Sequence, residues 1–254
     1  HFGSVSLTAD PSRTATLDAA ARAKKLGATI TYDPNYRANL WKNKEDAIAQ
    51  MKAPLPLVDI LKVSDEELPL LTGTTDCESG TAQLAQNGIK LIFVTLGPDG
   101  VFYRFGDKTG HVAGVPCKVG DTNGAGDTFF GAALSKLCKE ELDTLTVDKL
   151  EGILGFANKA ASITTSRHGA IPAMPTLAEV EAEPWQQNRN LSPGLPSTRT
   201  SWNGCSWSCT TTGKGWKFWS GRWQKLQRPQ RRAENTGQGP YCDPECTSAA
   251  ICSA

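Results

Sequence analysis

The first 180 residues alternate short apolar runs with segments of helical periodicity, and this alternation limits the fold more than any other feature. Ala28–Asp33, Val58–Ser64 and Lys90–Gly97 have the length and the apolar character of buried strands. Thr14–Gly27 has helical spacing and ends on a glycine, which is a common stop signal. Strands that alternate with helices form a mainly parallel sheet covered on both faces. The sequence therefore predicts an α/β fold over this part of the chain.

The same reading places the other elements. Gly100–Phe105 and His111–Val115 are typical of a hairpin, and the remaining segments predict helices at 44–52, 65–73, 77–88, 126–139 and 147–165. In parallel sheets, ligands bind beyond the carboxyl ends of the strands. We expect the functional residues at that edge.

Composition changes abruptly near Val180, which predicts a division into residues 1–180 and 181–254. The second segment holds six of the seven tryptophans, has no valine, and is dense in polar residues, glycine and proline. It offers no periodic apolar face with which to offset the entropy of ordering. A low-order tail, a frame-shifted or chimeric sequence, and a basic-aromatic nucleic-acid binder at Lys214–Lys225 are the open interpretations. Its five cysteines form an imperfect zinc pattern.

The overall totals point to no special partner. The formal net charge is +1, with 39% hydrophobic and 21% charged residues. This balance gives no reason to expect nucleic acid, a membrane surface or a strongly charged molecule as a partner. No apolar run of membrane-spanning length and no signal peptide occur, so we expect a cytoplasmic protein.

The stretch GDTNGAGDTFFGAAL, residues 120–134, joins a glycine-rich turn to a helix. Gly124, Ala125 and Gly126 let the backbone approach a ligand closely. The unpaired N–H groups and the positive dipole end of the following helix favour an anion, most naturally phosphate. Asp127 then suits a base that accepts a hydroxyl proton during phosphoryl transfer. The alternative is an ordinary aspartate at a helix start after a glycine turn.

The longer string Asp121–Phe129, D-T-x-G-A-G-D-x-F, resembles the second signature of the PfkB (ribokinase-like) carbohydrate kinase family. Other segments resemble the family in the same order along the chain. They are FGSVSL (2–7), which resembles a strand, YDPNYRANLW (32–41), LKVSDEELPLLTG (61–73), VTLGPDGV (94–101) and FANKAASITTSRHGAIPAMPT (156–176). Fructokinases are the nearest subgroup, and ketodeoxygluconate kinases share part of the D-x-N-x-R pattern. The resemblance implies a ribokinase-like three-layer sandwich with a mainly parallel sheet. It also implies that the N-terminal strands and the lid of such kinases are lacking here.

The resemblance implies roles for the residues of the signature. Asp127 would be the catalytic base that also contacts the sugar, and Gly124, Ala125 and Gly126 would form the anion hole. Asp121 and Asn123 fall where the family has a monovalent-cation site, completed by the loop Ser166–Ile171. For Asp121, a turn-forming role is the alternative.

Further residues are implied at the nucleotide. Thr95, Gly97, Gly100, Asn158 and Lys62 would line the ATP site, with Lys62 reaching the phosphates and Asn158 beside the adenine. The alternatives are that both glycines only turn the chain into the hairpin, and that Asn158 faces solvent.

Two more charged residues complete the expected site. Glu67 would organise Mg²⁺ through water, or else serve only as a partner of the helix dipole. Arg37 would bind a phosphate or a sugar hydroxyl, or else form a surface ion pair.

The resulting functional expectation is ATP-dependent phosphorylation of a sugar, with fructose converted to fructose 6-phosphate. ATP and Mg²⁺ are the expected cofactors, with K⁺ as a further one, and the parent enzyme is expected to be a homodimer. Ketodeoxygluconate or another sugar is the alternative substrate. An inactive nucleotide-binding fragment is the alternative of a different class.

Overall fold

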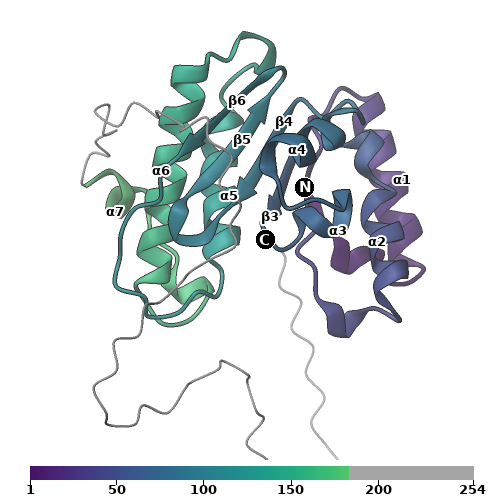
Figure 1. The fold of residues 1–254 in the computed structure, drawn as a ribbon, viewed down its shortest axis with the longest axis horizontal. Coiled ribbons are helices and arrows are strands. Elements are labelled where there is room, and N and C mark those ends of the chain that lie inside the picture. Colours follow the sequence, from purple (N-terminus) through teal and green to yellow (C-terminus); the bar gives the residue numbers. More distant parts are fainter. Residues whose placement is uncertain (183–254) are drawn as a thin grey trace, which may run out of the picture. The chain divides into compact units, whose positions relative to one another are not determined.

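A computed structural model describes residues 1–182, which lie in the first of the two units into which the chain divides, His1–Pro193. These residues form a six-stranded sheet between two layers of helices (Figure 1). The strands follow one another across the sheet in chain order. They are β1 (Phe2–Gly3), β2 (Thr31–Asp33), β3 (Ile60–Ser64), β4 (Leu91–Thr95), β5 (Val101–Phe105) and β6 (Lys108–Val112). The first four are parallel, whereas β5 and β6 are antiparallel to their neighbours. The predicted α/β fold with a mainly parallel sheet is confirmed.

Helices cover both faces of the sheet (Figure 1). One layer contains α1 (Ser12–Lys25), α2 (Lys44–Lys52), α3 (Leu68–Thr72) and α4 (Cys77–Ala85). The other contains α5 (Ala125–Leu137) and α6 (Val147–Thr165), and the short α7 (Leu177–Glu181) packs against α6. Short 3₁₀ turns complete the elements, η1 (Ser4–Leu7), η2 (Ala38–Leu40), η3 (Leu55–Leu57), η4 (Gly97–Asp99), η5 (Leu142–Thr144) and η6 (Ile171–Ala173).

The sheet separates two hydrophobic cores. Alternate residues of β3 and β4 point to opposite faces, as the two-residue period of a strand requires. Leu61 and Ile92 join the core beneath α1–α4. Ile60 and Phe93 join the core beneath α5 and α6. By the same period Lys62 shares the face of Ile60, so it lies on the side of the sheet that α5 covers.

One expected strand is shorter than predicted. Only Phe2–Gly3 of the segment 2–7 is extended, and Ser4–Leu7 forms the 3₁₀ turn η1. The Ser4 N–H donates to the carbonyl of Pro34 at 3.0 Å, beyond the last residue of β2. The chain then turns toward α1, because β2 offers no further partner.

Two other expectations concern membrane-spanning helices and the second segment of the chain. Across the described residues, every helix is too short or too polar to cross a membrane. The interpretations of the segment 181–254 fall almost entirely outside the described residues.

Candidate active site

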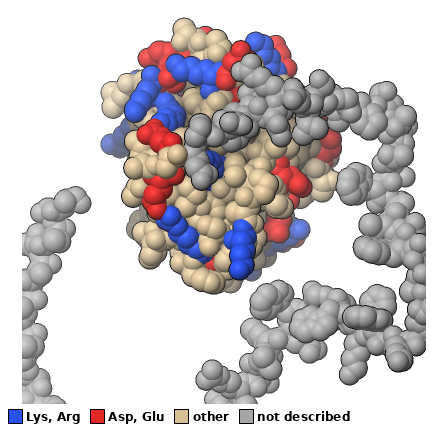
Figure 2. All heavy atoms as spheres, turned by 90° about the vertical axis from the view of Figure 1, so that its left-hand side faces the viewer, with Lys and Arg blue, Asp and Glu red and all other residues tan. Residues whose placement is uncertain are grey.

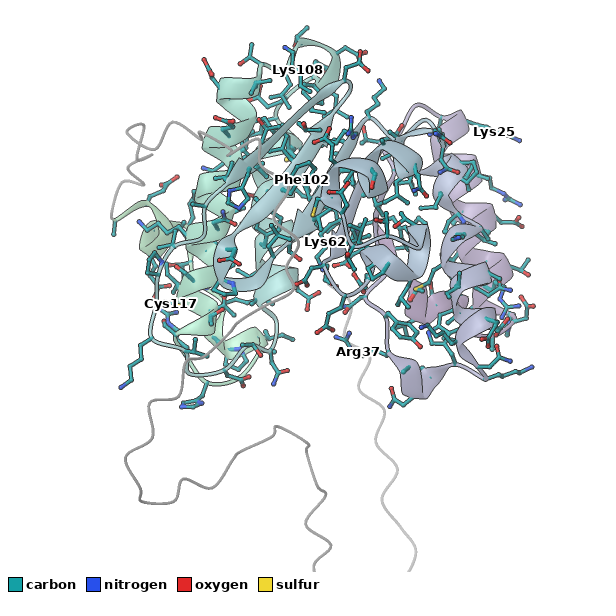
Figure 3. The ribbon with its side chains drawn as sticks, in the orientation of Figure 1. Lys25, Arg37, Lys62, Phe102, Lys108 and Cys117 are labelled. Atoms are coloured by element: carbon teal, nitrogen blue, oxygen red, sulfur yellow. The ribbon has the colours of Figure 1, made fainter. Side chains whose placement is uncertain are left out.

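A buried lysine and a helix start meet at the carboxyl edge of the sheet. Lys62 of β3 is 6% exposed, and its Nζ lies 3.0 and 3.2 Å from the two carboxylate oxygens of Asp33, at the end of β2. A methyl group on Gly126, in the first turn of α5, would lie 3.2 Å from the same Nζ. Figure 3 shows Lys62 at the centre of the molecule, between the two helical layers. A fixed positive charge therefore adjoins the helix N-terminus.

The first turn of α5 has the geometry of an anion cradle. Gly124 precedes the helix in the left-handed conformation, with φ at 76°. The Ala125 N–H makes a long bond of 3.3 Å to the Thr122 carbonyl. Within the described part of the chain, the N–H groups of Gly126 and Asp127 have no backbone acceptor. Unpaired N–H groups, the helix dipole and the adjacent Lys62 fit a phosphate group.

Asp127 is exposed at the start of α5 and is approached by one amide. Asn35 Nδ2 lies 3.5 Å from Asp127 Oδ1, a long hydrogen bond between residues 92 positions apart. Asn35 follows β2, and its own N–H donates to Asp33 Oδ1 at 3.1 Å. The turn after β2 thus connects the buried ion pair to the exposed carboxylate.

Burial controls the charge of Asp33. The pKa of its carboxyl is raised to about 6, chiefly by the loss of hydration on burial and to a lesser extent by the negative charges of Glu67 and Asp127. The ammonium group of Lys62 lowers this pKa, and the value of about 6 is the balance of all these effects. Burial has the larger effect because Asp33 is 4% exposed.

Glu67 holds two loops together. Its Oε1 accepts the Tyr36 N–H at 2.6 Å, and its Oε2 accepts the Ser64 N–H at 2.9 Å. The side chain lies just before α3 and is 7% exposed. Glu67 was predicted to organise Mg²⁺, and in this structure both oxygens already accept backbone N–H groups. Each oxygen retains a second lone pair that a water molecule could occupy.

Asp121 ties the segment before α5 to the loop after α6. Its Oδ1 accepts the Asn123 N–H at 3.0 Å, which makes the expected turn, and its Oδ2 accepts the Gly169 N–H at 3.2 Å. Both bonds lower the pKa of the Asp121 carboxyl. Asn123 is exposed. The loop Ser166–Ile171 therefore lies beside Asp121, as expected for the cation site. Among the described residues, no group of three His, Cys, Asp or Glu could hold a metal ion.

The residues expected at the nucleotide lie in different settings, some at strand ends and turns and one buried in a helix. Thr95 ends β4, and Gly97 and Gly100 turn the chain into the β5–β6 hairpin. Gly100 has a φ of 95°, and a methyl group there would lie 2.2 Å from the Val112 carbonyl oxygen. Asn158 is 5% exposed, and its Nδ2 donates to the carbonyls of Val112 and Ala113 at 3.1 and 2.9 Å. The solvent-facing alternative for Asn158 is therefore wrong, because its amide is buried and satisfies two carbonyls.

A hollow of about 430 Å³ lies between α6, the segment that follows β6, and α7. Its lining includes Val115, Pro116, Cys117, Lys159 and Ile163. Sites for small molecules are roughly 300–1,000 Å³.

On the face of the molecule that Figure 2 shows, acidic and basic side chains are interspersed and do not form a patch of one sign.

Arg37 lies at the exposed end of the turn after β2 and points away from Lys62 (Figure 3). Its Nη1 donates to the carbonyl of Tyr36 at 3.1 Å. No acidic side chain of the described residues pairs with it. The ion-pair alternative is therefore not supported, and the guanidinium is available to a ligand.

Sequence reasoning did not single out Asp33 and Asn35. Both belong to the D-x-N-x-R stretch, in which only Arg37 was given a role. Polar residues directly after a buried strand of a parallel sheet were the available signal, since that edge holds the ligand. Their partners in β3 and α5 are distant in sequence, so the contacts themselves could not be inferred.

The family assignment rests on the match of the whole described region. The pfkB family of carbohydrate kinases matches residues 1–177. The chain belongs to this family. Fructokinase-1 of Zea mays is 42% identical over 181 residues, which make up 71% of this chain and 56% of the maize protein. The match thus spans little more than half of that relative. A putative fructokinase-8 of Arabidopsis thaliana is 40% identical over 180 residues, 70% of this chain and 86% of that protein.

A solved structure supports the ribokinase-like fold of this pfkB family chain. The crystal structure of fructokinase from Vibrio cholerae, with fructose, ADP and calcium ion bound, superposes with a TM-score of 0.68 at 32% identity. The match covers 73% of this chain and 60% of the Vibrio protein. The predicted family and fold are both confirmed.

Proposed function

We propose that this chain carries the phosphoryl-transfer part of an ATP-dependent sugar kinase, with fructose as the substrate and fructose 6-phosphate as the product. The observation that supports this most is the convergence of three groups at the first turn of α5. They are the unpaired Gly126 N–H, the buried Lys62 ammonium and the exposed Asp127 carboxylate. An anion cradle beside an accessible base is what transfer to an alcohol requires.

Each group has a definite part in the reaction. The amides of Gly124, Ala125 and Gly126 hold the developing charge of the γ-phosphoryl group, and Lys62 adds a fixed positive charge beneath them. Asp127 accepts the proton of the sugar's primary hydroxyl as the hydroxyl oxygen attacks phosphorus. The bond to the β-phosphate oxygen breaks on the opposite side, which releases ADP.

The nucleotide lies along the carboxyl edge of the sheet in this proposal. Thr95, Gly97 and Gly100 flank the phosphates, and the adenine ring occupies the hollow beside α6. Asn158 supports that hollow by fixing the carbonyls of Val112 and Ala113. Lys62 acts on the phosphates as a buried charge.

Two metal ions belong to this proposal. Mg²⁺ usually binds substrate phosphates together with few protein oxygens, and when bound it neutralises charge on the triphosphate. Glu67 fits such a role through water, since both of its oxygens keep a free lone pair. A monovalent cation such as K⁺ is assigned to Asp121 and Asn123 with the neighbouring loop Ser166–Ile171.

The sugar is inferred from the relatives. The maize relative is a fructokinase, and the Vibrio structure contains fructose and ADP. Arg37 is exposed in the turn after β2, the same turn whose Asn35 contacts Asp127. This position suits contact with a sugar hydroxyl or a phosphate. Because the match spans little more than half of the maize protein, activity of the chain is itself part of the proposal.

The test measures sugar-dependent ADP formation by the purified chain with fructose, ketodeoxygluconate and ribose. We expect fructose to be preferred and Asp127→Asn to lower kcat about 100- to 10,000-fold. Asp148→Asn, also in the first turn of a helix, is the matched control and should leave turnover unchanged. Nucleotide binding without turnover would indicate an inactive nucleotide-binding fragment, and full activity of Asp127→Asn would disprove the assigned base.

A further inference from the structure

Asn35 combines a rare backbone conformation with a contact to the proposed base. Its φ is +48°, and it is the one non-glycine residue with positive φ in the described part of the chain. Positive φ is uncommon in residues with a side chain, although asparagine tolerates it better than most. Strained backbone of this kind persists where the surroundings hold it in place, and it is often found at functional sites.

Hydrogen bonds hold the backbone on both sides of this residue. The Asn35 N–H donates to the buried carboxylate of Asp33, which Lys62 holds in turn. The next N–H, that of Tyr36, donates to Glu67 at 2.6 Å. Two buried carboxylates on β2 and before α3 therefore fix the turn, and the turn directs the Asn35 amide toward α5.

We infer that Asn35 is a positioning residue for Asp127, an inference that rests on the proposed function. Its Nδ2 donates to Asp127 Oδ1 and leaves Oδ2 to accept the sugar's hydroxyl proton. Without this donor the carboxylate can rotate freely, since it is exposed on the surface of α5. Hydrogen bonds of this kind are commonly long in an unliganded enzyme and shorten when substrate binds.

The charged groups around this contact are Asp33, Lys62 and Glu67, and the first two form a pair. Asn35 is neutral, so it orients Asp127 without adding charge near the γ-phosphate. An acidic residue at position 35 would add a negative charge beside the base and would remove the donor. The chemistry of the position therefore requires an amide and not only a residue that tolerates positive φ.

The first experiment separates orientation from folding. Asn35→Gly removes the amide but suits the left-handed backbone, so its urea midpoint should equal that of the wild-type chain. We expect its kcat to fall about 10- to 100-fold, because misplacing a reacting group costs that much, while KM for ATP stays within about twofold. Asn35→Asp should lose at least as much. Asn39→Gly, an exposed asparagine in the same segment, is the control and should keep full activity.

A second measurement does not depend on turnover. The side-chain NH₂ resonances of Asn35 in the ¹⁵N spectrum of the full chain should shift in Asp127→Asn and stay unchanged in Asp148→Asn. If the wild-type chain shows no turnover, the proposed function fails and these resonances alone decide whether the contact exists. Unchanged Asn35 resonances in Asp127→Asn, or a normal kcat in Asn35→Gly, would overturn the inference.

Discussion

The buried pair of Asp33 and Lys62 should leave a pH signature on stability. Replacing both residues, in Asp33→Asn/Lys62→Met, removes the two charges together and leaves neither one buried alone. The side chains are 5% and 7% exposed, so solvent screens them little. The double variant is therefore the reference against which the wild-type pair can be measured.

The magnitude follows from the raised pKa of Asp33. The ordinary value is 3.8, and burial raises the folded-state pKa to about 6. As pH rises from 4 to 6, the unfolded carboxyl ionises while the folded one keeps its proton, which favours unfolding. At pH values below the unfolded-state pKa, the stabilising contribution of Asp33 is fully present. At pH values above the folded-state pKa, that contribution is lost. The difference between 3.8 and about 6 corresponds to about 3 kcal/mol.

Urea unfolding followed by far-ultraviolet circular dichroism measures this. Tryptophan fluorescence is unsuitable, since six of the seven tryptophans lie after residue 180. The free energy of unfolding of the wild-type chain, relative to the double variant, should fall by about 2 kcal/mol between pH 4 and pH 6, and by about 3 kcal/mol over the wider range from pH 3 to pH 7. The exposed pair Lys90–Asp143 is the control, and its neutral double variant should show no trend in this range. A difference that is constant, or that rises with pH, would refute the reasoning.

Two further changes test the geometry of the edge. Gly100→Ala should cost at least about 3 kcal/mol of unfolding free energy in urea, because its methyl group meets the Val112 carbonyl at 2.2 Å in a strained backbone. Gly97→Ala, with a φ of 58° and no atom within 4 Å of the new methyl group, should cost only about 1 kcal/mol, and equal costs would show that the close approach is absent. Glu67→Gln should cost about 2–4 kcal/mol, since the amide can accept only one of the two buried N–H bonds. The exposed Glu66→Gln should cost little. An equally stable Glu67→Gln would contradict the role of Glu67 in joining the two loops.

The arrangement of the elements could be predicted because local patterns agree with the global fold. The glycines at positions 27, 73 and 88 end helical segments, and all three have positive φ in the structure. Lys90–Gly97 contains the apolar run Leu91–Val94, and residues 91–95 form a central strand buried on both faces. The first strand was predicted too long, because nothing in FGSVSL marks where its neighbour β2 ends.

The site was predictable only where one continuous motif carries it. The glycine turn, the helix start and Asp127 lie within seven residues, so their proximity is a local property. Lys62 was assigned to the phosphates, but its ion pair with Asp33 depends on the pairing of β2 with β3. The contact of Asn35 with Asp127 joins two elements 92 residues apart. Such contacts depend on tertiary packing, which no local pattern encodes.

Because Lys62 projects from an interior strand, its ammonium group keeps the same place while the surrounding loops change. If Lys62 supports the transferred group as proposed, loops could exchange residues and select other acceptor molecules during divergence, while that electrostatic support would be inherited intact. An engineer who wishes to alter specificity should vary the turn after β2 at Arg37 and beyond, and should leave the strand-borne cation and its carboxylate partner untouched.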